Sequence, residues 1–343
     1  MEEDGERQLN IGEIARRANV STATVSRTLN QSGAVKPETA RKVWRAAAAL
    51  NYYPNSHARA LVSGRSRLIG LIVSDITNPF FPELIRSFEG LATQHSYDLI
   101  VTSTDYQTAR MTACLKRMLE RKVDGVAIMT SEMDLGLLKE LSRRGVPIVF
   151  MDVGQVGPRM SHVALDYSHG IHQAVDHLVG LGHKHIAFIS GPLDLHSART
   201  RRQAFLEGMR DHGLRPAPSL LREGTHTAEG GAQAMTALLR LTKPPTAVVA
   251  SNDWTAIGAL HAIHAAGKRV PEDISLVGFD DIPLVSYTMP PLTSVRMSAA
   301  DVGVTAFQAL FGLIDGDRLE GAVYQVPTKL IVRHSTLPAG RRG

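Results

Sequence analysis

The chain has 343 residues, of which 43% are hydrophobic and 21% are charged, a composition typical of a folded protein with two or three domains. A single cysteine excludes an intrachain disulfide framework, and no apolar run approaches the ~20 residues of a membrane-spanning helix. The acidic, polar N-terminus is not a signal peptide, so we expect a reduced, cytoplasmic protein with no membrane association.

The positive charge is concentrated at one end of the chain. Residues 1–67 account for the whole formal net charge of +5, and residues 68–343 carry no net charge. A small basic module joined to a neutral body favours a polyanionic partner for the module alone.

The basic segment predicts three helices, over residues 11–18, 22–29 and 37–50. Asn10 and Ser21 are suitable N-caps for the first two, and Pro37 suits the first turn of the third. Two short helices joined by a tight turn, with a third packed across them, are typical of a helix-turn-helix unit.

The second of these helices would enter the major groove of DNA with its N-terminus. Arg27 can donate a pair of hydrogen bonds to guanine, with a phosphate contact as the alternative, and Ala23 can touch a thymine methyl group. Thr24 and Ser26 either contact the DNA backbone and so position the head on it, or are simply solvated. The predicted DNA contacts of this unit are Ser21, Thr22, Ala23, Thr24, Ser26, Arg27 and Asn30.

The basic segment resembles the DNA-binding head of the lactose-repressor/galactose-repressor family of bacterial regulators. The pieces that match are ANVSTATVSRTLN, LNYYPN and RALVSGRSRLIG. The resemblance implies a hinge helix after the head, capped by Asn55, in which Arg59 contacts phosphate and Leu61 enters the minor groove as an apolar wedge. Packing of Leu61 against the body is the alternative.

From residue 68 onward, short β-rich apolar runs alternate with helical stretches near 81–95, 108–121, 135–144, 171–181, 198–212, 228–241 and 256–266. The predicted strands are LIGLIV, DLIVTST, VDGVAIM and PIVFMD, then HIAFIS, a short strand near 220–223, AVVAS and ISLVGFD. Such strands predict parallel sheets covered on both faces, here in two lobes with a cleft between them. We expect one helix near 300–315 and a strand-rich segment after it to complete both lobes.

The body resembles the effector-binding core of the same family, which is related to periplasmic sugar-binding proteins. The matching motifs are DITNPFF, LVGLGHKHIAFISGP, SARTRRQAF, VVASNDWTAIGAL, VPEDISLVGFDD and PPLTSVR. The implied fold is an all-α helix-turn-helix head with a hinge helix, followed by an α/β core of two doubly wound parallel-sheet lobes. We expect the head at 9–54, the hinge and linker at 55–67, and the core at 68–336. The N-lobe then takes 68–165 with part of 292–325, and the C-lobe takes 166–291 with 326–336.

Polar residues that follow the predicted strands form the expected effector site at the cleft. Two carboxylates, an amide and a guanidinium suit a ligand with vicinal hydroxyl groups, although Asp152 and Asp280 could instead cap helices or form pairs between the lobes. The effector is predicted to be a monosaccharide or small glycoside. The residues that we expect to contact it, several of them on the resemblance alone, are Asn78, Phe80, Phe81, Asp152, Arg199, His226, Asn252, Trp254, Asp280 and Met297.

The sequence lacks the nucleophile-elbow, zinc-protease and phosphate-loop motifs of common enzymes. The histidine pairs His169/His172 and His261/His264 have helical spacing, but no cysteine pair supports a metal site. We therefore expect no enzymatic activity, no metal and no cofactor.

Together these features predict a transcription regulator, most simply a homodimeric repressor that binds a pseudo-palindromic operator in double-stranded DNA. A small-molecule effector between the lobes would control that binding. An activator, a corepressor-dependent regulator and a sugar-binding receptor with the same body stay open as alternatives. The C-terminus carries no leucine heptads, so we do not expect a tetramerising coil.

Overall fold

The computed structural model describes residues 11–29, 33, 35–52, 64–131, 136, 140–141, 143–152, 156–316 and 320–340. The chain divides into two compact units, Met1–Arg67 and Leu68–Gly343. Within the described ranges, no helix is long and apolar enough to cross a membrane.

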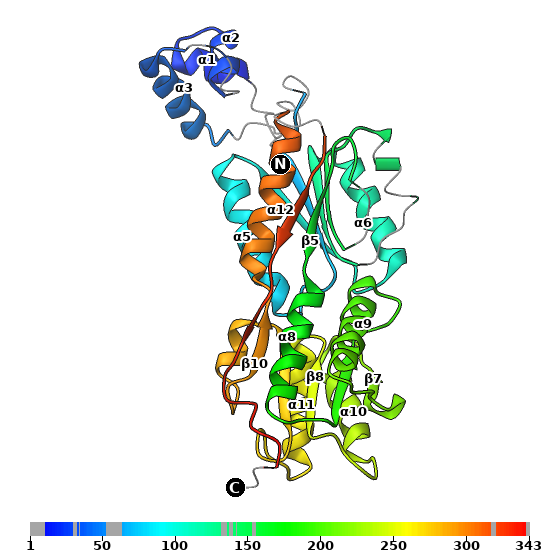
Figure 1. The fold of residues 1–343 in the computed structure, drawn as a ribbon. Helices are drawn as coiled ribbons and strands as arrows, with labels where there is room; N and C mark the ends of the chain where they lie inside the picture. The colour runs from blue at the N-terminus through cyan, green and yellow to red at the C-terminus, as the bar shows by residue number, and fades with distance from the viewer. Residues whose placement is uncertain are drawn as a thin grey trace, which may run out of the picture. The chain divides into compact units, whose positions relative to one another are not determined.

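The described residues of the first unit form a bundle of three helices, α1 (Ile11–Ala18), α2 (Thr22–Leu29) and α3 (Pro37–Ala49) (Figure 1). Ile14, Val25 and Val43 are fully buried where the helices meet. The Ser21 hydroxyl accepts a hydrogen bond from the Thr24 amide at 3.2 Å, so Ser21 caps α2 as the sequence predicts. The three predicted helices are confirmed.

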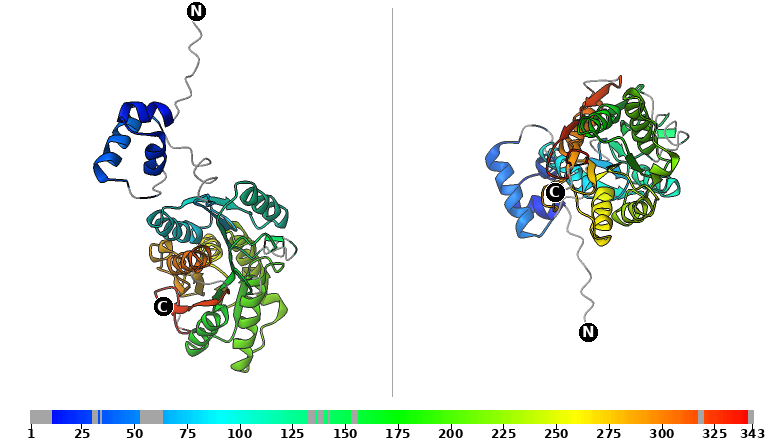
Figure 2. Two further views of the ribbon diagram at one scale, coloured as in Figure 1. Left: turned by 90° about the horizontal axis from the view of Figure 1, so that it is seen from above. Right: turned by 60° about the horizontal axis from the view of Figure 1, so that its bottom comes forward.

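The N-lobe of the second unit contains a six-stranded parallel sheet in the order β11-β5-β4-β3-β1-β2. Helices α5 (Phe80–Gln94) and α12 (Ala299–Ile314) cover one face, and α6 (Thr108–Glu120) covers the other. Figure 2 (left) shows α5 in cyan and α6 in teal on opposite sides of the strands. The strands are β1 (Leu68–Val73), β2 (Asp98–Ser103), β3 (Gly125–Met129), β4 (Ile148–Met151), β5 (Met160–Leu165) and β11 (Val323–Val326).

The C-lobe contains the second six-stranded sheet, in the order β12-β10-β9-β8-β6-β7, in which β12 is antiparallel and the other strands are parallel. Its helices are α8 (Tyr167–Gly180), α9 (His196–Asp211), α10 (Ala228–Leu239) and α11 (Asp253–Ala265), with two short 3₁₀ helices at Pro218–Leu220 and Pro283–Ser286. The strands are β6 (Ile186–Ser190), β7 (Leu221–Glu223), β8 (Ala247–Ala250), β9 (Ser275–Asp280), β10 (Thr293–Arg296) and β12 (Lys329–Ile331).

Burial on both faces explains why the central strands read as continuous apolar runs. In β1, Ile69, Leu71 and Val73 pack on the α5 side, whereas Ile72 packs on the α6 side. Cys114 of α6 lies in the latter cluster and is buried. The predicted fold class, a helical head and two parallel-sheet lobes, is confirmed.

The chain crosses between the lobes three times, at β5–α8, β10–α12 and β11–β12. The first and third crossings are joined, because the Thr328 hydroxyl donates to the Asp166 carbonyl oxygen at 2.7 Å. The Met297 amide of the second crossing donates to the carbonyl oxygen of Asp280 at 3.2 Å. The three crossings and these hydrogen bonds form a short hinge between the lobes beside the cleft.

Two strands and several helix starts differ from the prediction. β5 and β10 were not expected, because each contains polar residues that weaken the apolar signal of a strand. Helix α8 begins at Tyr167 rather than near 171, since Asp166 accepts a hydrogen bond from the His169 amide and caps it. The helix predicted at 135–144 lies largely outside the described residues.

Candidate functional site

The exposed face of α2 carries the predicted DNA contacts of the head. Thr22, Ala23 and Arg27 are exposed, whereas Val25 and Leu29 hold the opposite face in the core. Ser21 and Thr24 also hydrogen-bond to each other through their hydroxyls at 2.9 Å, so these two hydroxyls already have partners at the N-terminus of α2. This arrangement leaves Thr22, Ala23 and Arg27 as the side chains most available to DNA.

Exposed basic residues also lie on the other two helices of the head. Arg16 and Arg17 end α1, and α3 carries Arg41, Lys42 and Arg45. Exposed cations of this kind suit contacts with phosphates. The predicted contacts Asn30, Asn55, Arg59 and Leu61 lie outside the described residues.

In the second unit, side chains from both lobes enclose a small cavity at the carboxyl ends of the strands. Its free volume is about 50 Å³, well below the ~300–1,000 Å³ of small-molecule pockets. The lining residues are Ser74, Asn78, Phe80, Phe81, Tyr106, Ser131, Met151, Asp152, Tyr167, Ser197, Arg201, His226, Asn252, Asp280 and Met297. All predicted effector residues except Arg199 and Trp254 are among them.

Arg201 takes the place that the sequence analysis gave to Arg199. Arg199 is exposed and donates to the carbonyl oxygens of Leu193 and Asp194, at 2.8 and 2.7 Å, on the outer surface. The Arg201 guanidinium is buried, and its carbon lies 4.3 Å from the ring centroid of Tyr167 and 4.4 Å from that of Phe279. Arg201, and not the predicted Arg199, therefore lines the cavity.

Arg201 also approaches Asp280 at the end of β9, with 4.0 Å between the guanidinium Nη2 and the carboxylate Oδ1. Burial raises the pKa of Asp280 to about 7, against the opposing attraction of Arg201. Among the described residues, the Nε of Arg201 has no hydrogen-bond partner. A buried, oriented donor of this kind is suited to an oxygen atom of a ligand.

Asp253, buried at the start of α11, holds the loop that follows Asp280. Its carboxylate accepts hydrogen bonds from the Ser294 hydroxyl at 2.6 Å and from the Ile282 amide at 2.8 Å. Burial, followed by the nearby charge of Asp280, raises the pKa of Asp253 well above its usual value. The loop is thus fixed from inside the C-lobe.

Asp152, at the end of β4, is the polar centre of the N-lobe wall. Its carboxylate accepts hydrogen bonds from the Ser131 hydroxyl and, at 2.7 Å, from the Tyr167 hydroxyl. The Ser131 hydroxyl also lies 2.9 Å from the Ser197 hydroxyl. Because Tyr167 and Ser197 belong to the C-lobe, these hydrogen bonds cross the cleft.

His226 fills the C-lobe side of the cavity as a neutral ring. Burial, followed by the charge of Arg201, lowers its pKa to about 3. A Cβ atom at residue 191 would lie 2.0 Å from the His226 Nε2, so glycine is required there. Across the cleft the Tyr106 ring lies 5.8 Å from the His226 ring.

Asn252 lines the cavity while stabilising its surroundings. Its side-chain oxygen accepts from the Thr255 amide at 2.9 Å, which caps α11, and its amide group donates to the His226 carbonyl oxygen at 3.2 Å. Trp254, the next residue but one, is half-buried outside the cavity.

Three polar residues of the cavity adopt positive φ angles that non-glycine residues rarely use: Asp152 (67°), His226 (62°) and Asp280 (108°). Such backbone strain is concentrated at functional sites in proteins, where the surrounding structure maintains it. Here the three residues with strained backbones all line the same cavity.

The sequence analysis missed several lining residues because each requires tertiary information. Ser131 and Ser197 are ordinary hydroxyls in loops or at a helix start, and Tyr167 precedes the expected start of its helix. Helical periodicity could have separated Arg199 from Arg201. In the described part of the chain, no three histidine, cysteine, aspartate or glutamate side chains are grouped as metal ligands.

Comparison with family models assigns both units. Residues 10–55 match the model for bacterial regulatory proteins of the lacI family, and residues 175–336 match the periplasmic binding protein-like domain.

Whole-length relatives agree with this assignment. Catabolite control protein A of Priestia megaterium is 33% identical over 327 residues, covering 95% of this chain and 98% of the relative. The ribose operon repressor of Halalkalibacterium halodurans is 36% identical, covering 95% and 96%.

Solved structures show the same architecture. The lac repressor dimer bound to operator and the anti-inducer ONPF matches with a TM-score of 0.85 at 30% identity, over 96% of this chain and 99% of that one. The complex of the regulator CelR with cellobiose matches with a TM-score of 0.71 at 29% identity, over 96% and 100%. A ribose-bound regulator from Enterococcus faecium matches with a TM-score of 0.70 at 28% identity, over 79% and 99%.

Proposed function

The chain belongs to the lacI family of bacterial regulatory proteins and is a DNA-binding transcription regulator, and from this premise we propose how it works. As a cytoplasmic homodimer it represses transcription by binding a pseudo-palindromic operator through two heads. A neutral sugar bound between the lobes of the core changes its affinity for that operator. Its relatives are transcription regulators rather than enzymes.

Arg27 is the head residue that we assign to base recognition. It is exposed on α2 beside Thr22 and Ala23, and a guanidinium can bind guanine O6 and N7 together. The surrounding basic residues of α1 and α3 supply affinity for phosphates that does not depend on sequence.

The observation that carries the effector proposal is the buried guanidinium of Arg201, held between two aromatic rings beside Asp280. Arg201 donates to sugar hydroxyls, whereas Asp152 and Asp280 accept from them. Phe80 and Phe81, whose rings meet edge to face at 5.4 Å, offer apolar surface to the carbon face of a sugar ring.

The charges of the cavity favour an uncharged sugar. Its lining contains two carboxylates and a single guanidinium, without lysine. A phosphate group would face Asp152 and Asp280 with one cation to balance it, at a cost in a poorly solvated site. We therefore propose that free sugars bind and sugar phosphates do not.

Binding must widen the cleft, because the cavity of about 50 Å³ is too small for a sugar ring. Lobes joined by three short crossings can change their separation by adjusting those segments. An effector that prefers one arrangement shifts the population towards it and so changes operator affinity.

Part of the dimer contact lies on the C-lobe loop at residues 283–290. Leu284, Tyr287 and Met289 are 45%, 81% and 83% exposed there, and adjacent large apolar side chains on a surface favour burial against another protein. We assign the second copy of this chain as that protein.

A thermal-shift series with D-ribose, cellobiose and ribose 5-phosphate tests the effector proposal, because a ligand of the folded state raises the melting temperature. We expect stabilisation by a free sugar and none by the phosphate. Stabilisation by ribose 5-phosphate alone contradicts the charge argument. Mobility shift with DNA selected by the protein from a random pool, with and without the stabilising sugar, tests the regulator; absence of selected DNA contradicts it.

A further inference from the structure

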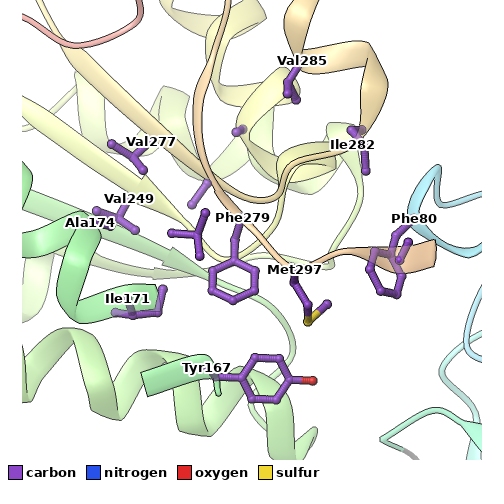
Figure 3. Close-up of a cluster of buried hydrophobic side chains, with 14 of the residues drawn as sticks. Phe80, Tyr167, Ile171, Ala174, Val249, Val277, Phe279, Ile282, Val285 and Met297 are labelled. Atoms are coloured by element: carbon purple, nitrogen blue, oxygen red, sulfur yellow. The ribbon is translucent and has the colours of Figure 1, made fainter. Parts of the chain in front are cut away.

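Tyr167 is placed to act on both lobes. It is the first residue of α8 in the C-lobe, directly after the first crossing, and its side chain is buried. Its ring packs against the Arg201 guanidinium and lies 6.0 Å from the Phe279 ring. Figure 3 shows the ring next to Phe279 and the hydroxyl pointing away from the C-lobe side chains Ile171 and Ala174.

The hydroxyl of Tyr167 forms a hydrogen bond with the N-lobe. It donates to Oδ1 of Asp152 at 2.7 Å, and Asp152 follows β4 of the N-lobe. The other carboxylate oxygen, Oδ2, accepts from Ser131, whose hydroxyl is 2.9 Å from that of Ser197 in the C-lobe. Two hydrogen-bonded connections between the lobes therefore converge on one carboxylate, and both consist of protein groups alone.

We propose that Tyr167 is a positioning residue that couples effector binding to separation of the lobes: its hydroxyl holds the lobes together through Asp152 until an effector competes for that carboxylate. This inference rests on the proposed function in taking the cavity as the effector site.

The competition follows from the space around Asp152. Its oxygens receive one hydrogen bond each, from Tyr167 and from Ser131, and a carboxylate can accept more. The cavity of about 50 Å³ has no room for a sugar ring beside these hydroxyls, so an effector hydroxyl that donates to Asp152 must take the place of one of them. The same event removes the restraint between the lobes. The Tyr167 ring also contacts Arg201, the residue that we assign to effector binding. Movement of Tyr167 therefore changes the surroundings of Arg201.

Distance measurement in the effector-free, full-length protein tests the bridge. Cys114 is the chain's single cysteine, so a Cys114→Ala background leaves spin labels only at introduced sites. Lys116→Cys on α6 and Gln233→Cys on α10 are exposed positions, one on each lobe. Pulsed electron paramagnetic resonance then reports the distribution of lobe separations.

In this background Tyr167→Phe keeps the ring and removes the hydroxyl. We expect the ratio of separated to closed lobes to rise about tenfold or more, the effect of losing a hydrogen bond to a charged acceptor. Ser197→Ala, which breaks the second connection, should shift the same ratio in the same direction. Tyr97→Phe is the matched control, because Tyr97 is a buried tyrosine of the N-lobe that packs against Phe311 away from the cavity.

A distribution unchanged by both Tyr167→Phe and Ser197→Ala, or shifted equally by Tyr97→Phe, overturns the proposal. A lower melting temperature with unchanged separation means that the hydroxyl is only structural and also overturns it. The distance measurement uses no effector. Failure of every sugar to bind would therefore count against the proposed effector, whereas the hydrogen bond between Tyr167 and Asp152 is tested by the distance measurement alone.

Discussion

Arg199 and Arg201 lie on opposite sides of α9. Two residues along an α-helix correspond to a rotation of about 200°, so only one of the two can face the cleft. The structure turns Arg201 inward between Tyr167 and Phe279, and leaves Arg199 on the outer surface bonded to backbone carbonyls.

This geometry predicts different results for one substitution at the two positions. Arg201→Gln should weaken sugar binding by about 10–150-fold, the cost of losing a charged hydrogen-bond donor at roughly 1.5–3 kcal/mol. Arg199→Gln should leave it within about twofold. Isothermal titration with whichever of D-ribose and cellobiose binds the unsubstituted protein measures both. Equal loss in the two variants would contradict the assignment of Arg201.

Arg27→Ala should reduce discrimination at one base pair of the operator. The expected loss is about 1–3 kcal/mol for the preferred base, with little change for other bases at that position. Competition binding with single-base operator variants measures it. Arg41→Ala is the control on α3, expected to weaken all sequences alike; if Arg27→Ala also weakens all sequences alike, Arg27 contacts phosphate.

Operator binding should weaken steeply with salt, because cations of the head displace counterions from the phosphates. The logarithm of the binding constant should fall linearly with the logarithm of salt concentration. Replacing Lys42 by glutamine should reduce the slope by about one if Lys42 contacts a phosphate. Fluorescence anisotropy between low and moderate salt measures the slopes, and a flat dependence would refute the electrostatic contribution.

Asp280→Asn should change the pH dependence of stability in a defined direction. The pKa of Asp280 is raised to about 7 in the folded protein, so between pH 4 and 7 the folded state holds a proton that the unfolded state has lost. The contribution of Asp280 is therefore most favourable below pH 4 and is lost as the pH rises towards 7.

Asparagine cannot ionise, so the variant should gain stability relative to the unsubstituted protein over this range, by about 1–4 kcal/mol. Urea unfolding at pH 4.5, 5.5 and 7 measures the difference. Asp273→Asn is the control: a hydrogen bond from the Arg269 amide lowers the pKa of Asp273, so this carboxyl stays ionised from pH 4.5 to 7 and the stability difference of that variant should not change across the series. A constant difference for Asp280→Asn would refute the burial argument.

Met289→Asp should weaken the homodimer, because it places a charge in the proposed contact at the loop 283–290. Sedimentation equilibrium should show at least a tenfold rise in the dimer dissociation constant. Lys184→Asp, an exposed change elsewhere in the C-lobe, is the control and should leave the constant unchanged. A dimer equally stable in both variants would place the contact elsewhere.

Local patterns in the sequence determine much of this protein. The caps Asn10 and Ser21 and the first-turn Pro37 predict the three-helix head, and the apolar runs that become β1, β3, β6 and β8 predict two covered parallel sheets. Because ligands in such folds bind at the carboxyl ends of the strands, Asp152 and Asp280, which follow strands of different lobes, could be assigned to the cleft before any coordinates.

Tertiary structure decided what local patterns leave undetermined. Which of two neighbouring arginines faces the cleft depends on how α9 packs, and β10 is recognisable only beside β9 and β12, which satisfy its hydrogen bonds. The Asp152–Tyr167 bridge joins residues from different lobes, whose meeting depends on three chain crossings. Periodicity along the sequence reports which face of an element is buried, whereas contacts between separate elements follow from the packing of the whole chain.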